Sequence, residues 1–196
     1  WATATGYFAA LGFSRINYGF TRFKHLKTIG DPEDALFLST CDADYIKRYF
    51  QGGFYSKTPV FRWAEHNSGA CTWSWVKEAF EAGRLSAEEA ESVRHNAMMG
   101  IVAGMTVSFP AVSSRSKGAL GLIADPGITP AAVDALFAAR KEEIMAVANE
   151  EAFLYLEAPP KRVAAFDVIV PYPRGEHHYM ITPDKIFYEI ERTIKF

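Results

Sequence analysis

Apolar side chains recur along this chain at two different spacings. Short apolar or alternating runs are typical of β-strands, and they occupy residues 13–20, 35–39, 71–73, 101–110 and 117–124. Segments with apolar positions at helical spacing predict helices over residues 2–11, 42–51, 58–63, 76–82, 86–99 and 129–156. A last amphipathic segment, which runs to Phe196, is predicted to form a further helix.

Several of these helices carry residues that favour a helix start. Ser86 is followed three residues later by a glutamate, which is the spacing of a capping box. Thr58 precedes a proline at the first helical position, where proline is favoured. Asp42 or Asp44 is placed to cap the helix through residue 51.

The order of the predicted elements indicates a fold class. Strands and helices are interleaved and grouped, rather than arranged in strict strand-helix-strand repeats. This grouping favours an α+β fold over a parallel α/β fold. We therefore expect an α-β-α sandwich with a central antiparallel sheet of about five strands and helices on both faces.

Composition narrows the class of protein. The chain has 196 residues, of which 49% are hydrophobic and 22% are charged, and this predicts one main globular domain. The formal net charge is -2 and no dense Lys/Arg stripe occurs, which argues against direct binding of nucleic acid by this chain. No run of about 18 apolar residues occurs, so we expect no membrane span. No charged-then-apolar leader is visible, so the cytoplasm is the expected location.

A cluster of aromatic residues is the first candidate for a binding site. Tyr45 and Tyr49 stand one helical turn apart, so both rings lie on one helix face. Trp73 and Trp75 stand two residues apart, and an extended backbone would place both on the same side. Such rings suit an apolar cavity with a few polar groups. From the residues alone, an ordinary aromatic core is the favoured interpretation.

An ordered set of motifs adds to this interpretation. The pair Tyr45 and Tyr49 is followed by Pro59-Val60, by Trp73, and by the segment 100–106 with the pattern Gly-Ile-x-x-Gly-x-Thr. Over about three quarters of the chain, this order and spacing resemble the autoinducer-binding half of LuxR-type quorum-sensing transcriptional regulators. The two glycines of the last motif are expected to serve the backbone, through a positive φ or a close approach.

The resemblance implies a function and a site. Members of that family are intracellular receptors for N-acyl homoserine lactones or related signals, held between the sheet and one layer of helices. A small-molecule signal as partner, a homodimer, no cofactor, no metal and no catalytic activity are therefore expected. The implied ligand-binding residues are Tyr45, Tyr49, Thr58 and Trp73, with Cys41 and Val60 as secondary candidates.

Three exchanges distinguish this chain from the family pattern. Tyr45 stands where the family has a lactone-contacting Trp, Thr58 where it has an amide-binding Asp, and Cys41 where it usually has a Tyr. A hydrogen bond to a charged group contributes roughly 1.5–3 kcal/mol, and an unpaired buried partner costs about 1–3 kcal/mol. The exchanges predict a different or more apolar signal than a common acyl homoserine lactone, or a site that has lost its ligand.

The end of the chain carries a second resemblance. The pieces Leu-Glu-Ala-Pro at 156–159, Arg-Val-x-x-x-Asp at 162–167 and Tyr-Pro at 172–173 fall in one order. They resemble the extreme C-terminus of the β subunit of thiamine-diphosphate-dependent 2-oxo acid dehydrogenases. We therefore divide the chain into a sensor domain, 1–148, and a C-terminal extension, 149–196. The extension lacks the pattern of a helix-turn-helix DNA reader.

Other functions stay open at this point. The chain is a candidate fragment of a 2-oxo acid dehydrogenase β subunit, although residues 1–148 do not resemble a thiamine-diphosphate fold. It is also a candidate antagonist that forms inactive mixed dimers with a full-length regulator. A third alternative is a ligand-free interaction module, whose interior would be collapsed. A ligand-sensing domain without enzymatic activity is the leading hypothesis.

Overall fold

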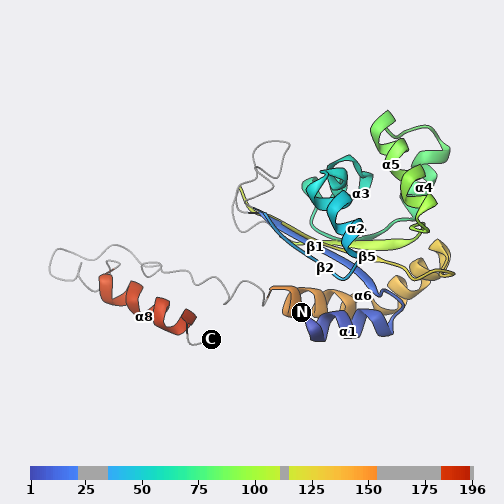
Figure 1. Cartoon of the computed structure of the whole chain (residues 1–196). Helices are drawn as coiled ribbons and strands as arrows, with labels where there is room; N and C mark the ends of the chain where they lie inside the picture. Colours follow the sequence, from blue (N-terminus) through green and yellow to red (C-terminus); the bar gives the residue numbers. More distant parts are fainter. Residues whose placement is uncertain (22–34, 111–114, 154–181, 195–196) are drawn as a thin grey trace, which may run out of the picture.

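A five-stranded antiparallel sheet forms the centre of the molecule (Figure 1). The computed structural model describes residues 1–21, 35–110, 115–153 and 182–194. The strand order is β2-β1-β5-β4-β3, and every neighbouring pair is antiparallel. The strands are β1 (Arg15–Thr21), β2 (Leu36–Ser39), β3 (Gly69–Thr72), β4 (Gly104–Ser108) and β5 (Lys117–Ile123).

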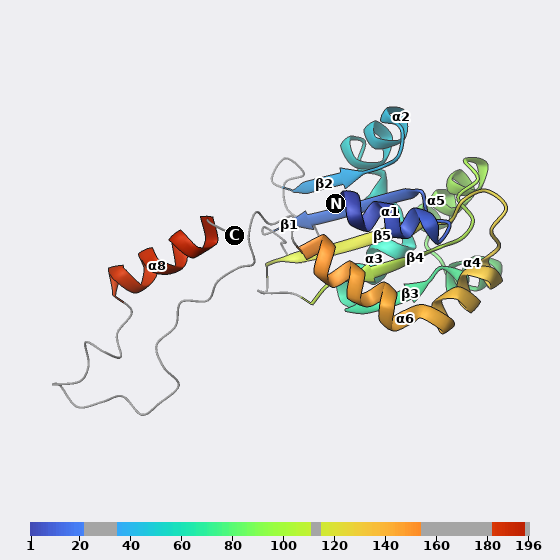
Figure 2. The ribbon, with the colours of Figure 1, turned by 90° about the horizontal axis from the view of Figure 1, so that it is seen from below.

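Helices cover both faces of this sheet. Two helices lie side by side on one face, α1 (Ala2–Ala10) and α6 (Pro130–Phe153) (Figures 1 and 2). The opposite face carries a layer of short helices: α2 (Ala43–Ile46), the π-helical turn η2 (Lys47–Gln51), the 3-10 turn η3 (Phe54–Lys57), α3 (Pro59–His66), α4 (Ser74–Glu81) and α5 (Ala87–Met98). The predicted α+β fold, an α-β-α sandwich, is confirmed.

The core lies between the sheet and the α1/α6 layer. Alternate strand residues point to this side, because successive side chains on a strand face opposite ways. The core strand residues are Ile16, Tyr18, Met105, Val107, Leu120 and Leu122, each 5% exposed or less. Phe8 of α1 and Ile144 of α6 pack against them, and both are buried. This face thus anchors the sheet and leaves its other face to the short helices.

Helix starts follow the sequence signals closely. Ser86 and Glu89 form the capping box at the start of α5, with both reciprocal hydrogen bonds present. Asp42, rather than Asp44, accepts from the Tyr45 backbone N–H at 2.8 Å and caps α2. The helix predicted over 42–51 is α-helical only in its first half, and it widens into a π-helical turn over Lys47–Gln51.

Two predicted segments differ from the structure. The run 101–110 becomes a strand only at Gly104, because Gly100 ends α5 with φ +69° and the Ile101 N–H still bonds to the Asn96 carbonyl. Trp73 and Trp75 do not share one face of an extended stretch, so that prediction was wrong. Trp73 is the cap residue of α4, and Trp75 lies in the first turn of that helix.

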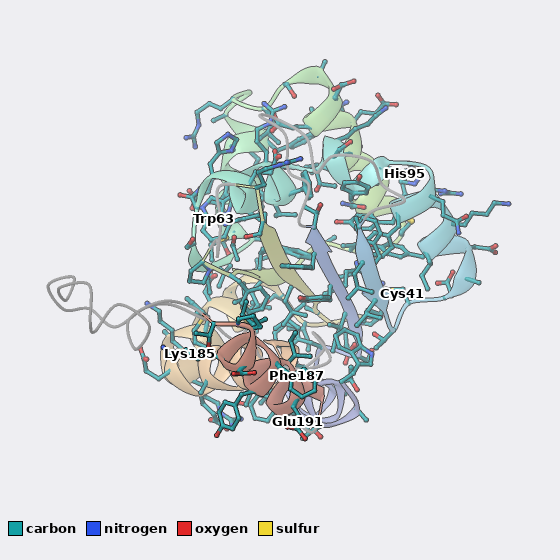
Figure 3. The ribbon with its side chains drawn as sticks, turned by 90° about the vertical axis from the view of Figure 1, so that its left-hand side faces the viewer. Cys41, Trp63, His95, Lys185, Phe187 and Glu191 are labelled. Atoms are coloured by element: carbon teal, nitrogen blue, oxygen red, sulfur yellow. The ribbon has the colours of Figure 1, made fainter. Side chains whose placement is uncertain are left out.

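The C-terminal part of the chain contains the end of α6 and the helix α8. Helix α6 continues through residue 148 to Phe153 and is kinked at Arg140, where φ is −130°. The motifs at 156–159, 162–167 and 172–173 lie outside the described residues, and the division at 148/149 stays a prediction. Helix α8 (Pro183–Ile194) carries exposed apolar side chains, among them Phe187 at 68% (Figure 3). None of the helices in the described ranges has the length and hydropathy to cross a membrane.

Candidate ligand-binding site

A cavity of about 520 Å³ lies between the sheet and the layer of short helices. Its volume is within the range of small-molecule sites. The sheet supplies its floor from β1, β4 and β5, and α2 to α5 supply its walls. This face of the sheet therefore borders a cavity, whereas the face toward α1 and α6 carries the hydrophobic core.

The floor consists of the strand residues that alternate with the core positions. Small or polar side chains dominate it: Asn17, Gly19, Thr21, Thr106, Ala119 and Gly121, with Ile123 as an apolar member. Asn17 and Thr106 both stand opposite Gly121 in the strand register, from β1 and β4 respectively. Gly121 thus lies at the centre of a row with one polar side chain on each side.

The walls are largely aromatic. The rings come from β2, the α2/η2/η3 stretch, α3 and α4: Phe37, Tyr45, Tyr49, Phe50, Tyr55, Phe61, Trp73 and Phe80. The rings of Tyr45 and Tyr49 are stacked, with centroids 5.1 Å apart and an interplanar angle of 17°. Tyr49 also contacts Phe50 and Tyr55 by its ring. Such a wall gives a large apolar surface with a few hydroxyl groups.

Tyr45 connects the helical wall to the floor. The Asn17 side-chain amide donates to its hydroxyl oxygen at 3.0 Å. Burial raises the pKa of Tyr45 well above its ordinary value, so the phenol is neutral at physiological pH. The Tyr45 hydroxyl is therefore a polar group at the cavity surface that keeps a hydrogen to donate.

Trp73 is held from the other side of the floor. Its indole N–H donates to the Thr106 hydroxyl at 2.9 Å, and its backbone N–H donates to the Gly104 carbonyl at 2.9 Å. The ring lies directly over Gly104, because a Cβ placed there would be 2.6 Å from Trp73 Cζ3. The glycine expected to serve a close approach does so, by admitting the indole.

Thr58 is buried in the cavity wall, with 1% of its surface exposed. Its hydroxyl donates to the Tyr55 carbonyl at 2.8 Å and accepts from the Phe61 N–H, so it caps α3. It is also hydrogen-bonded to the Tyr49 phenol. The hydroxyl is thus already engaged by the protein, which limits what it offers to a guest.

The structure brings most of the predicted residues together. Tyr45, Tyr49, Thr58, Val60 and Trp73 all line the cavity. Cys41 does not line it; this free thiol lies beside the end of β2, with its sulfur 3.7 Å from Asn17 Oδ1 (Figure 3). Whether these side chains contact a ligand stays a prediction.

None of the seven floor residues was predicted as a site residue, and these include Asn17, Thr106 and Gly121. Strand alternation groups the residues of one strand by face, but it does not say which faces of different strands meet or that a face borders a cavity. Asn96 on α5 also lines the cavity, and its Oδ1 atom is buried with no hydrogen-bond partner among the described residues. Within the described ranges, no three His, Cys, Asp or Glu side chains are grouped to hold a metal ion.

The Tyr49 phenol predicts a loss of stability at alkaline pH. Burial raises its pKa to about 12, against the lowering effect of the Thr58 hydrogen bond. An unfolded tyrosine ionises near pH 10, so the folded state holds its proton more tightly. Its contribution to the free energy of unfolding is then fully present below pH 10 and is lost as the pH rises to 12. Urea denaturation measures the free energy of unfolding of the wild type and of Tyr49→Phe. The difference between the two should shrink by roughly 2 kcal/mol from pH 10 to pH 12. A constant difference would contradict the assignment.

Comparisons with known proteins bear on both parts of the chain. The family described as autoinducer binding domain matches residues 1–153. An N-acylhomoserine lactone-dependent LuxR-family transcription factor from Burkholderia cenocepacia superposes with a TM-score of 0.54 at 16% identity, over 78% of this chain and 82% of that one. The VqsR ligand-binding domain of Pseudomonas aeruginosa gives a TM-score of 0.44 at 14% identity, over 74% and 79%.

The C-terminal part has different relatives. The family described as transketolase, C-terminal domain, matches residues 134–186. Pyruvate dehydrogenase E1 component subunit beta is 43% identical over 53 residues in Acholeplasma laidlawii and 40% identical over 53 residues in Mycoplasma pneumoniae. Each match covers 27% of this chain, and the chain spans only 16% of the length of each relative.

Proposed function

The chain belongs to the autoinducer-binding domain family, and from this premise we propose that it is a cytoplasmic receptor for a small apolar signal. The ligand is held in the cavity between the sheet and the short helices. Tyr45, Tyr49, Thr58, Val60 and Trp73 form its surroundings, as the sequence motifs suggest. The observation that carries the proposal is the aromatic-walled cavity of about 520 Å³ in the family's ligand-binding half.

The chemistry of the cavity favours a signal other than a common acyl homoserine lactone. Thr58 gives no charged acceptor at its position, and its hydroxyl is bonded to Tyr55. Tyr45 offers one phenol donor, held by Asn17. The wall is otherwise mostly rings. A guest with an apolar body and few polar atoms suits these surfaces better than one with a lactone and an amide.

Calorimetry with a panel of acyl homoserine lactones tests this preference. We expect no binding tighter than micromolar to the wild type, because the charged acceptor is missing. The double variant Tyr45→Trp and Thr58→Asp should gain at least about tenfold in affinity, since a charged hydrogen bond contributes more than 1.4 kcal/mol. Aspartate also caps a helix, so α3 is expected to persist.

The uncharged Thr58→Asn variant is the control for the change at position 58. Asparagine caps as well as aspartate but lacks the charge, so its affinity should stay within about threefold of the wild type. Submicromolar binding of a common acyl homoserine lactone by the wild type would refute the proposed preference. Receptor function in the cavity would then stand with a different ligand.

The assembly is part of the proposal. We propose a homodimer, as the family resemblance suggests, and sedimentation velocity measures it directly. A second role favoured by the C-terminal match is a unit of a thiamine-diphosphate enzyme. Addition of thiamine diphosphate should leave the melting temperature unchanged if the sensor proposal is right, and an increase would favour the enzyme. Co-purification with a full-length regulator would support a mixed-dimer antagonist.

A further inference from the structure

We propose that Asn17 is a positioning residue that fixes the Tyr45 hydroxyl as a donor toward an acceptor atom, such as a carbonyl oxygen, on the ligand. The inference rests on the proposed receptor function and adds that the protein donates this hydrogen bond and the ligand accepts it. Asn17 lies on β1 and is 8% exposed. It contacts the ligand-facing tyrosine through its amide nitrogen and the end of β2 through its amide oxygen.

The direction of this hydrogen-bond chain follows from the donors that surround the Asn17 amide oxygen. The backbone N–H of Cys41 can only donate, and it donates to Ser39 Oγ at 3.1 Å. The Ser39 hydroxyl hydrogen then goes to Asn17 Oδ1 at 2.7 Å. With its oxygen occupied in this way, the Asn17 amide presents its N–H to Tyr45, at 3.0 Å.

A reversed amide would break the chain. Ser39 Oγ would then receive two N–H groups, and its own hydrogen would lose the Asn17 acceptor. The observed arrangement satisfies each group in sequence, and such chains strengthen each bond by polarisation. The amide orientation therefore follows from the Ser39 hydroxyl and the Cys41 thiol, which both donate to the Asn17 oxygen.

The consequence appears at the cavity surface. A phenol oxygen that accepts from Asn17 directs its own hydrogen elsewhere, and the described residues provide no acceptor for it. Burial keeps the phenol protonated, because it raises the pKa of Tyr45. Beside Asn17 in the register stands Gly121, where an added Cβ would meet nothing closer than 3.8 Å. A ligand carbonyl thus has space next to the Tyr45 hydroxyl.

The other side of Gly121 has the same polarity. The Trp73 indole N–H can only donate, so the Thr106 oxygen receives it and the Thr106 hydrogen stays available. Asn17 and Thr106 are the two register neighbours of Gly121 on this floor. Hydroxyl donors therefore lie on both sides of Gly121, which has no side chain. This arrangement matches a flat ligand with acceptor atoms along the sheet.

Two isosteric probes test the polarity, namely hexanophenone and hexylbenzene, which differ by a carbonyl in place of a methylene. Their affinities are measured by tryptophan fluorescence for the wild type, Tyr45→Phe, Asn17→Asp and the double variant. Asn17→Asp keeps the shape and still accepts from Ser39, but it turns the donor toward Tyr45 into an acceptor. The Tyr45 hydrogen should then bond to the new carboxylate instead of the ligand.

The expected result is a loss of about tenfold in hexanophenone affinity for each single variant, equal to one hydrogen bond. Hexylbenzene affinity should be unchanged, and Asn17→Asp should add nothing in the Tyr45→Phe background. If Asn17→Asp fails to fold, Asn17→Ala should lower the ketone affinity about threefold, because the hydroxyl is no longer oriented. If Asn17 had only a structural role, its variants would lower the affinities for both probes equally.

Two outcomes overturn the proposal and are distinguishable. If the ketone affinity is insensitive to the Asn17 variants while both probes bind, the positioning role is wrong and the receptor function stands. If neither probe binds the wild type, the receptor function itself fails, and the polarity inference fails with it.

Discussion

Replacing Gly104 by alanine should lower the free energy of unfolding by roughly 3 kcal/mol, which makes it one of the two largest effects expected here. A Cβ at this position would collide with the Leu122 carbonyl oxygen and would lie 2.6 Å from Trp73 Cζ3. A backbone oxygen in a central strand cannot move away without a large cost in free energy. For a chain of this size the melting temperature should fall by about 6 to 12 °C, as measured by circular dichroism.

The matched control is the same change one strand away. Gly121→Ala adds a methyl group at a floor position where the nearest atom, the Asn17 carbonyl oxygen, is 3.8 Å away. Its stability should stay within about 1 kcal/mol of the wild type. Equal losses for both variants would contradict the role of Gly104 as the site of close approach for the indole.

Gly121→Val should separate binding from stability. The side chain projects into the cavity, and valine favours strands, so the fold should lose less than about 1 kcal/mol. The same atoms occupy the space above the floor that a guest needs. Overpacking costs typically 1–3 kcal/mol, so hexanophenone affinity should fall by about tenfold to a hundredfold.

A size series gives that prediction its control. Gly121→Ala should weaken hexanophenone only a few-fold, because a single methyl group leaves most of the cavity open. Fluorescence titration of the two variants beside the wild type measures the trend. Unchanged affinity in the valine variant would mean that the guest does not lie over this part of the sheet.

Local sequence patterns predict much of the fold. The capping box at Ser86 and the Thr58-Pro59 pair predict helix starts correctly, because caps depend on residues a few positions apart. The run 117–124 likewise predicts a strand, and β5 forms there. The sandwich follows from these patterns, since each element needs a partner for its apolar side.

The site needed more than local pattern. The position of Trp73 depends on a bond to the Gly104 backbone, which the local sequence around residue 73 does not contain. The extended backbone predicted for Trp73 and Trp75 is therefore wrong. The chain enters α4 directly after Trp73.

The role of Asn17 also could not be predicted from local sequence. Its partners Ser39 and Tyr45 come from different elements and meet only through the pairing of β1 with β2. A lone asparagine in a strand gives no signal of such a role. The motif resemblance located Tyr45, but the residue that orients its hydroxyl emerges only from the packed structure.

The most direct test of the central claim is a set of nuclear Overhauser contacts between bound hexanophenone and the side chains of the chain. We expect saturable one-to-one binding, with contacts to the rings of Tyr45 and Trp73 and to the floor beside Gly121. An absence of saturable binding, or contacts confined to residues outside this cavity, would contradict it.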